Sequence, residues 1–183
     1  MKIIALDQST TAVGMSLFED SKLVNYMLIK PKLTTSKKVT ELMRECDLDN
    51  HIYLLKMPKD IYDDKWSRIT IIVDTLKLFF EKEHPDIVYF EDVYESKNRK
   101  GFQSLSILQG FVAHLCHDLN IAYEVVNESK WIKSWGKYNK TIKRKERKLD
   151  VMKKVNDLYG LNITVDDLSD SIAIGKYATE IEC

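Results

Sequence analysis

The sequence predicts one α/β domain, spanning 1–183, built on a five-stranded mixed sheet flanked by helices. Three observations support this. The first 29 residues hold three short apolar runs joined by polar turns, as in an antiparallel meander. Two later apolar runs, 86–91 and 121–126, each follow a segment of helical period, as parallel strands do. A length of 183 residues with 44% hydrophobic content suits one core.

The meander is expected at 2–6, 13–18 and 23–29, with a turn at 19–22. Residues 30–66 are polar and mixed, and Pro31 and Pro58 interrupt them. We expect this stretch to be an insertion or a mobile lobe. A short helix around 39–46 is the only element predicted within it, and no chemistry is assigned to it.

The elements after residue 66 follow from periodicity. An amphipathic helix begins at Ser67 and ends before Pro85, and the strand 86–91 follows directly. Apolar residues at helical spacing predict a second helix over 105–115, before the strand 121–126. A third helix over 149–158 ends at Gly160. Thr164 and Asp167 resemble a capping box and mark the start of the last helix.

Charge is unevenly distributed along the chain. The formal net charge is zero, with 28 basic and 28 acidic residues. Nine of the basic residues but only one acid, Glu146, lie in 130–148, so the rest of the chain carries a net charge of −8. A strongly positive segment on an acidic body is typical of a phosphate-binding surface.

Four carboxylates have reason to converge. Asp7 ends the first strand, and Glu91 ends the fourth. If these two strands are parallel neighbours, the two residues leave the same sheet edge about 5 Å apart. Asp167 and Asp170 are three residues apart and share a face of the last helix. Clusters of carboxylates hold Mg²⁺ or Mn²⁺, and two such ions can clamp a phosphodiester.

Each of these features also has a simpler interpretation. Asp7 could be a turn residue that caps local backbone. Acids in the first turn of a helix are favoured by the helix dipole alone. The lysine-rich segment could be an ordinary solvated face, although Trp131, Trp135 and Tyr138 lie among the lysines. Aromatics that stack on bases beside cations that neutralise phosphates favour a nucleic-acid surface.

Four motifs, at both ends and in the middle of the chain, resemble those of a known protein family. They are Ile-Ile-Ala-Leu-Asp7 with Gly14 seven residues on, Phe90-Glu91-Asp92-Val93-Tyr94 with Ser96-Lys97-Asn98, the lysine-rich approach to Lys148, and Asp167-Leu-Ser-Asp170-Ser-Ile-Ala-Ile. With these motifs the chain resembles the RuvC-type Holliday junction resolvases of the ribonuclease H-like superfamily, as a bacteriophage member. It departs from that pattern at Gln-Ser-Thr-Thr after Asp7 and in the length of 30–66.

The resemblance implies roles for individual residues. Asp7, Glu91, Asp167 and Asp170 would be the catalytic acids that bind metal. Tyr94 falls where the family has an aromatic that stacks on bases at the junction centre, and Lys148 would bind or polarise the phosphate. DNA contacts are further expected from the basic residues Lys97, Lys133, Lys140, Lys143, Arg144, Lys145 and Lys148.

The resemblance also implies the reaction and its partners. It predicts an Mg²⁺-dependent endodeoxyribonuclease, with Mn²⁺ able to substitute and two ions per site. It would resolve Holliday junctions by paired nicks that leave 5′-phosphate ends, with other branched DNA as further candidate substrates. A homodimer matches the two-fold symmetry of a four-way junction. No membrane partner and no nucleotide cofactor are expected.

Two other classes of function compete with this one. A non-catalytic module that binds branched DNA would use the acids structurally. An actin-like kinase fragment is suggested by Ile-Ala-Leu-Asp7-Gln-Ser-Thr-Thr, but the chain is short for such a kinase and has no glycine-rich adenosine motif.

Cys46, Cys116 and Cys183 form no Cys-x-x-Cys pair, and no apolar run could span a membrane, so we expect a cytoplasmic protein, in the bacterial host if phage-encoded.

Overall fold

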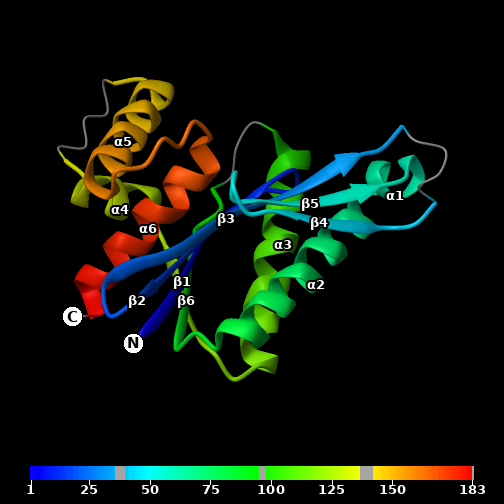
Figure 1. Cartoon of the computed structure of the whole chain (residues 1–183), viewed down its shortest axis with the longest axis horizontal. Helices are drawn as coiled ribbons and strands as arrows, with labels where there is room; N and C mark the ends of the chain where they lie inside the picture. The colour runs from blue at the N-terminus through cyan, green and yellow to red at the C-terminus, as the bar shows by residue number, and fades with distance from the viewer. Residues whose placement is uncertain (36–39, 95–97, 137–141, 183) are drawn as a thin grey trace.

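A computed structural model describes residues 1–35, 40–94, 98–136 and 142–182. Seven strands of this part of the chain form one mixed sheet in the order β4-β5-β3-β2-β1-β6-β7 (Figure 1). The strands are β1 (Lys2–Gln8), β2 (Val13–Glu19), β3 (Lys22–Leu33), β4 (Met43–Asp47), β5 (Ile52–Met57), β6 (Ile87–Glu91) and β7 (Ala122–Val126). The predicted mixed α/β sheet is confirmed, but it has seven strands rather than five.

The predicted meander forms β1, β2 and β3. β1 pairs antiparallel with β2, and β2 pairs antiparallel with β3. Asp20 and Ser21, at the tip of the second hairpin, both have positive φ (47° and 65°), as a type I′ turn requires. β1 is central and apolar because both its faces are covered: Ile3 and Ala5 belong to one hydrophobic cluster, whereas Ile4 and Leu6 belong to the other.

Helices cover both faces of the sheet (Figure 1). On one face, α2 (Lys65–Glu83) and α3 (Arg99–Asp118) pack against the cluster that contains Ile4 and Leu6. On the other face lie α4 (Glu128–Ser134), α5 (Arg144–Tyr159) and α6 (Asp166–Glu182). α1 (Lys59–Asp63) is short and precedes α2. α6 packs across β1 and β2, so its first turn lies over the middle of the sheet.

Local signals explain most helix boundaries. Asp64 caps α2 by accepting a hydrogen bond from the Ser67 amide at 2.8 Å. His84 ends α2 in the left-handed region, directly before Pro85. Gly160 ends α5 in the same conformation, as predicted. The last helix begins at Asp166, and the Val165 carbonyl accepts from the Ser169 amide, so the capping box predicted at Thr164 is wrong.

The segment 30–66 extends the sheet, and the helix predicted around 39–46 is wrong. Within its described residues, β4 pairs antiparallel with β5, and β5 pairs parallel with the second half of β3. β3 runs through Pro31, which lies past Ile29, the last residue of β3 paired with β2. At that point one edge of the strand needs no amide donor, so proline is tolerated there.

No helix in the described ranges is long and apolar enough to cross a bilayer.

Candidate active site

Two acids meet at one edge of the sheet, as predicted. β1 and β6 are parallel neighbours, and Leu6 is paired with Phe90. The next residue in each strand is Asp7 and Glu91, so both carboxylates leave the sheet side by side. Asp7 is 8% exposed, and Glu91 is largely buried. The pairing of the strands therefore sets the position of both acids.

The first two turns of α6 bring the other two acids to this edge. Gly14 is paired with Asp7 across the β1–β2 hairpin, and the backbone of Asp167 lies directly over Gly14. Asp170, one turn further, is 2% exposed, and Asp167 is half-buried. Asp7, Glu91, Asp167 and Asp170 therefore lie around one centre, which we call the acid centre. The structure brings together all four acids that the sequence singled out.

The acids interact strongly through the low-polarity interior. Burial raises the pKa of Asp7 well above its ordinary value, and the negative charges of Asp170 and Glu91 raise it further. Burial and the nearby Glu128 raise the pKa of Glu91 to about 7, against the hydrogen bond that the Trp131 indole donates to it at 3.1 Å. Ionising all four carboxylates together therefore requires positive charge at the centre.

Lys148 supplies positive charge from the first half of α5. Its Nζ lies 2.6 Å from Asp170 Oδ2 and 3.1 Å from Asp166 Oδ2. Burial disfavours its charged form, but the carboxylates of Asp170 and Asp7 outweigh burial and raise the pKa of Lys148. For Asp170, burial raises the pKa to about 6, although the positive charge of Lys148 opposes this shift. The ammonium group therefore stays charged beside Asp170.

The donor set fits a hard divalent cation. The Asp170 Oδ1 atom is buried and has no hydrogen-bond partner among the described residues, and a carboxylate oxygen is the kind of ligand that such a cation prefers. No three of the four acids have ligand atoms within 4.8 Å of one another, so their spacing is wider than a closed metal site requires. Among the described residues, only His114, His117 and Asp118 meet that distance. That trio is exposed on α3. The acid centre thus offers carboxylate ligands for a cation, but its carboxylate oxygens lie farther apart than they would around a bound ion.

Gly14 is required where α6 crosses the sheet. A Cβ atom at this position would overlap the Asp167 carbonyl, which is backbone and cannot turn aside. We expect Gly14→Ala to displace the start of α6, lower the free energy of unfolding by about 1–3 kcal/mol and separate Asp167 from Asp7. Thermal unfolding and metal-dependent stabilisation would measure both effects.

Gly110→Ala is the matched control for this prediction. Gly110 lies within α3, and nothing would come within 4 Å of its added methyl group. Alanine is the better helix former, so this variant should be unchanged or more stable by up to about 1 kcal/mol. Wild-type stability in Gly14→Ala would mean that α6 does not pack this closely on β2.

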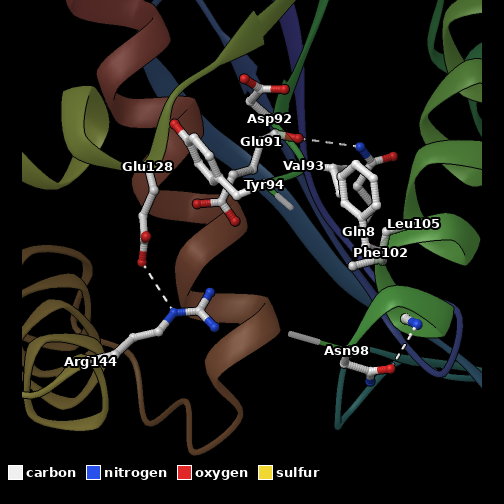
Figure 2. Close-up of a pocket in the computed structure, with 11 residues that line it drawn as sticks. Gln8, Glu91, Asp92, Val93, Tyr94, Asn98, Phe102, Leu105, Glu128 and Arg144 are labelled. Carbon is white, nitrogen blue, oxygen red and sulfur yellow. Dashed lines mark hydrogen bonds and ion pairs between the residues drawn. The ribbon is translucent and has the colours of Figure 1, made fainter. Parts of the chain in front are cut away.

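A pocket of about 320 Å³ opens beside Glu91 (Figure 2). We call it the Glu91 pocket. Gln8, Tyr94, Phe102 and Arg144 are among the residues that line it. Arg144 Nε donates to Glu128 Oε1 at 3.2 Å, and Gln8 Nε2 donates to the Glu91 carbonyl at 3.4 Å. Tyr94 is 48% exposed and lines this pocket together with Glu91.

A second hollow, of about 500 Å³, lies between α5 and the start of α6. Arg144, Lys145, Lys148, Thr164 and Asp166 are among its lining residues, and we call it the basic hollow. Lys143 is exposed at the N-cap of α5, and Lys133 is exposed on α4. The predicted contacts Lys97 and Lys140 fall outside the described residues.

The tryptophans of the basic segment do not form a stacking surface. Trp131 is 1% exposed and donates to Glu91, and Trp135 is partly buried and donates to the Ala173 carbonyl at 3.1 Å. The expectation that they stack on bases is therefore wrong for both. The third aromatic, Tyr138, lies outside the described residues. The short helix α4 turns both indoles inward, where they join the core under α6.

Sequence reasoning missed Glu128, Gln8 and the role of Trp131. Glu128 is the first residue of α4, and its only signal was Asn127, a favourable N-cap that accepts from the Ser129 amide. Nothing in the sequence indicated that Glu128 would meet Arg144 or face Glu91. These contacts depend on how α4 packs against α5 and the sheet.

Solved structures share this fold. Thermus thermophilus RuvC in complex with a Holliday junction substrate superimposes with a TM-score of 0.65 at 14% identity, over 100% of this chain and 96% of the other. A second structure of that protein gives 0.64 at 14% identity with the same coverage. The yeast mitochondrial Holliday junction resolvase Ydc2 gives 0.52 at 13% identity, over 97% of this chain and 77% of the other. No curated protein matches the sequence.

The topology and its acid-bearing edge define the RuvC-type, ribonuclease H-like fold, which confirms the resemblance seen in the sequence. The chain belongs to the family described as Lactococcus phage M3 protein, whose model matches residues 43–180. The family's phage name agrees with the expected bacteriophage origin.

Proposed function

We propose that this chain is a metal-dependent endonuclease that cuts four-way and other branched DNA. The observation that carries the proposal is the acid centre: four carboxylates from β1, β6 and α6 lie together beside Lys148, and a basic hollow adjoins them. The fold shared with RuvC, which has been solved on a Holliday junction, supports branched DNA as the substrate class.

Asp7, Glu91, Asp167 and Asp170 would hold the metal, for which we expect two Mg²⁺ ions that Mn²⁺ can replace. The ions would supply charge neutralisation at the phosphate and a more acidic bound water. Water would add to phosphorus as the bond to the 3′ oxygen breaks, and a proton from that water would pass to the 3′ oxygen, which leaves 5′-phosphate and 3′-hydroxyl ends. Lys148 would bind a non-bridging phosphate oxygen, since its ammonium group lies between the acid centre and the basic hollow.

The surface around the acid centre suits a DNA strand. Arg144 and Lys145 line the basic hollow, and Lys143 begins the same helix. Together they place positive charge along the path to Lys148. Two copies related by a two-fold axis would present two such centres to opposite strands of a junction, so we propose a homodimer.

Cleavage of a labelled synthetic four-way junction tests the proposal directly. The junction would be compared with a matched linear duplex and a three-way fork, in Mg²⁺ and in chelator. Metal-dependent, symmetric nicking of the junction alone would identify a strict resolvase, and equal cutting of the fork would identify a general branch-specific nuclease. Junction binding without any cutting would contradict the proposal and favour the non-catalytic module.

Tyr94→Ala should slow junction cutting more than it weakens junction binding. The exposed ring beside Glu91 is placed to stack on a base at an opened branch point, and stacking would favour the opened form that is cut. We expect cutting to fall about tenfold and binding to change about twofold. A junction with unpaired bases at its centre is the control, because it needs no opening and should restore the rate. Unchanged cutting of the fully paired junction would remove Tyr94 from this role.

Replacing Lys143 and Lys145 with alanine should weaken junction binding and flatten its salt dependence. Both side chains are exposed at the start of α5, so their loss removes phosphate contacts without breaking the core. The slope of log K against log salt should fall by about 1–2. Lys153→Ala, an exposed lysine farther along α5 that pairs with Asp157, is the control. An unaltered slope would make this face an ordinary solvated surface.

A further inference from the structure

Three hollows lie in sequence around the acid centre and share lining residues. Arg144 lines both the Glu91 pocket and the basic hollow. Thr164 lines both the basic hollow and a third hollow of about 490 Å³. Thr164 is three residues before Asp167, so the third hollow begins next to the acid centre. The three hollows are thus linked through shared lining residues and border the acid centre: Glu91 lines the first, Lys148 lines the second, and Leu168, the residue after Asp167, lines the third.

The third hollow is lined by the β4–β5 turn and by the α5–α6 connection. Tyr26 and His51 stack with ring centroids 4.0 Å apart and an interplanar angle of 23°. His51 Nδ1 lies 3.1 Å from the Tyr26 carbonyl, and the Leu28 amide donates to the His51 carbonyl at 2.8 Å. We call this cavity the Tyr26–His51 hollow. Asp49 and Asn50 of the turn also line it.

The opposite wall is held in place by Asn156 of α5. Its side-chain amide donates to the Ile163 carbonyl at 2.9 Å, and its side-chain oxygen accepts from the Ile163 amide at 2.9 Å. These two bonds fix the α5–α6 connection as a neighbouring strand would. The buried Ile163 side chain itself lies in the core. Both walls are therefore organised before any ligand arrives.

The chemistry of the hollow suits a base rather than a phosphate. Among the described residues, no lysine or arginine lines it, and Asp49 would repel a phosphate. Stacked rings, the amide of Asn50 and the carboxylate of Asp49 are groups that bind the face and the edge of a nucleobase. The neighbouring basic hollow carries the cations that a phosphate needs.

We propose that the Tyr26–His51 hollow holds a nucleobase of the DNA strand that passes the acid centre, on one side of the cut. This inference rests on the proposed function and deepens it. It gives the segment 30–66 a role, because the β4–β5 turn supplies His51, Asp49 and Asn50. The strand's phosphates would cross the basic hollow, and one unstacked base would enter the Tyr26–His51 hollow.

Four-way junctions that carry 2-aminopurine at single positions on either side of the cut would test this in chelator, where the wild type binds without cutting. Stacking quenches 2-aminopurine, so we expect wild-type protein to quench it at one or two positions on one side. His51→Asn should remove that quenching and weaken junction binding about five- to tenfold. Asparagine tolerates the left-handed backbone of His51 (φ 52°). Tyr26→Phe keeps the ring and should keep the quenching.

His84→Asn is the matched control, because His84 is exposed, lies at the end of α2 and has the same backbone conformation (φ 49°). Thermal unfolding checks that each variant is folded. If wild type binds the junction without quenching at any position, or His51→Asn quenches as the wild type does, the inference is overturned while junction cutting in Mg²⁺ still stands. If the wild type cuts no branched DNA, the proposed function fails, and this inference fails with it.

Discussion

Asp7→Asn is expected to abolish cutting, with a fall of about a thousandfold or more, while the protein still binds junction DNA. Asp7 lies at the centre of the site, where burial and the charges of Asp170 and Glu91 raise its pKa. Asparagine keeps the shape but loses the negative charge that would hold a divalent cation. Junction cutting and a binding isotherm, measured on the same preparation, separate the two effects.

The same substitution should raise the melting temperature of the metal-free protein. It removes one of several buried like charges, and a gain of 1 kcal/mol in a domain of this size is worth about 2–4 °C. Mg²⁺ should stabilise the wild type by mass action and should stabilise the variant much less. A higher melting temperature in chelator, together with a smaller stabilisation by Mg²⁺, is the result expected if Asp7 binds the metal.

Asp74→Asn provides the control for this prediction, since Asp74 is an exposed carboxylate on α2, on the opposite face of the sheet. It should change neither the cutting nor the response to Mg²⁺. Asp170→Asn should abolish cutting in the same way. Cutting that persists in Asp7→Asn would remove Asp7 from the active site and would return it to the role of a turn residue.

The positions of the acids could be predicted because each follows from a local rule. Asp7 and Glu91 each end an apolar run, and a helix between the runs makes parallel pairing the expected connection. Asp167 and Asp170 are three residues apart on a helix, which places them on one face. The predictions of the meander and of the end of α5 at Gly160 also rested on short stretches of sequence, and both are confirmed.

Elements at the sheet edge could not be predicted in this way. β4 exposes or half-exposes all five of its residues, so its sequence carries no period of two. β5 pairs with β3 from Leu28 to Leu33, a stretch in which the sequence shows a proline. The inward turn of Trp131 and Trp135 was hidden for a related reason: α4 has only seven residues, too few for a helical period to show against the surrounding lysines.

Lys148→Met is expected to have the second large effect, on stability as well as on activity. The ammonium group lies 2.6 Å from Asp170 Oδ2, and the Asp170 residue is only 2% exposed. Removing one partner of a buried pair costs about 3–5 kcal/mol, and we expect the lower end because the Lys148 side chain is 19% exposed. Chemical denaturation of the metal-free protein would measure this loss.

A double-mutant cycle with Asp170→Asn isolates the pair. With the carboxylate already neutral, Lys148→Met should cost much less than in the wild type, which gives a positive coupling energy. Lys153→Met is the control: this exposed lysine on the same helix pairs with Asp157, and its loss should change little. Equal losses with and without Asp170 would show that Lys148 acts through packing rather than through its charge.

Mg²⁺ distinguishes the structural role of Lys148 from its role toward the phosphate. A divalent cation at the acid centre would neutralise the carboxylates that Lys148 otherwise faces, so saturating Mg²⁺ should recover much of the lost stability in Lys148→Met. Cutting should nevertheless stay about a hundredfold below wild type, because no other described cation lies so close to Asp170. If cutting recovers along with stability, Lys148 serves the fold alone, and the phosphate must be bound by Arg144 and Lys145 in the basic hollow.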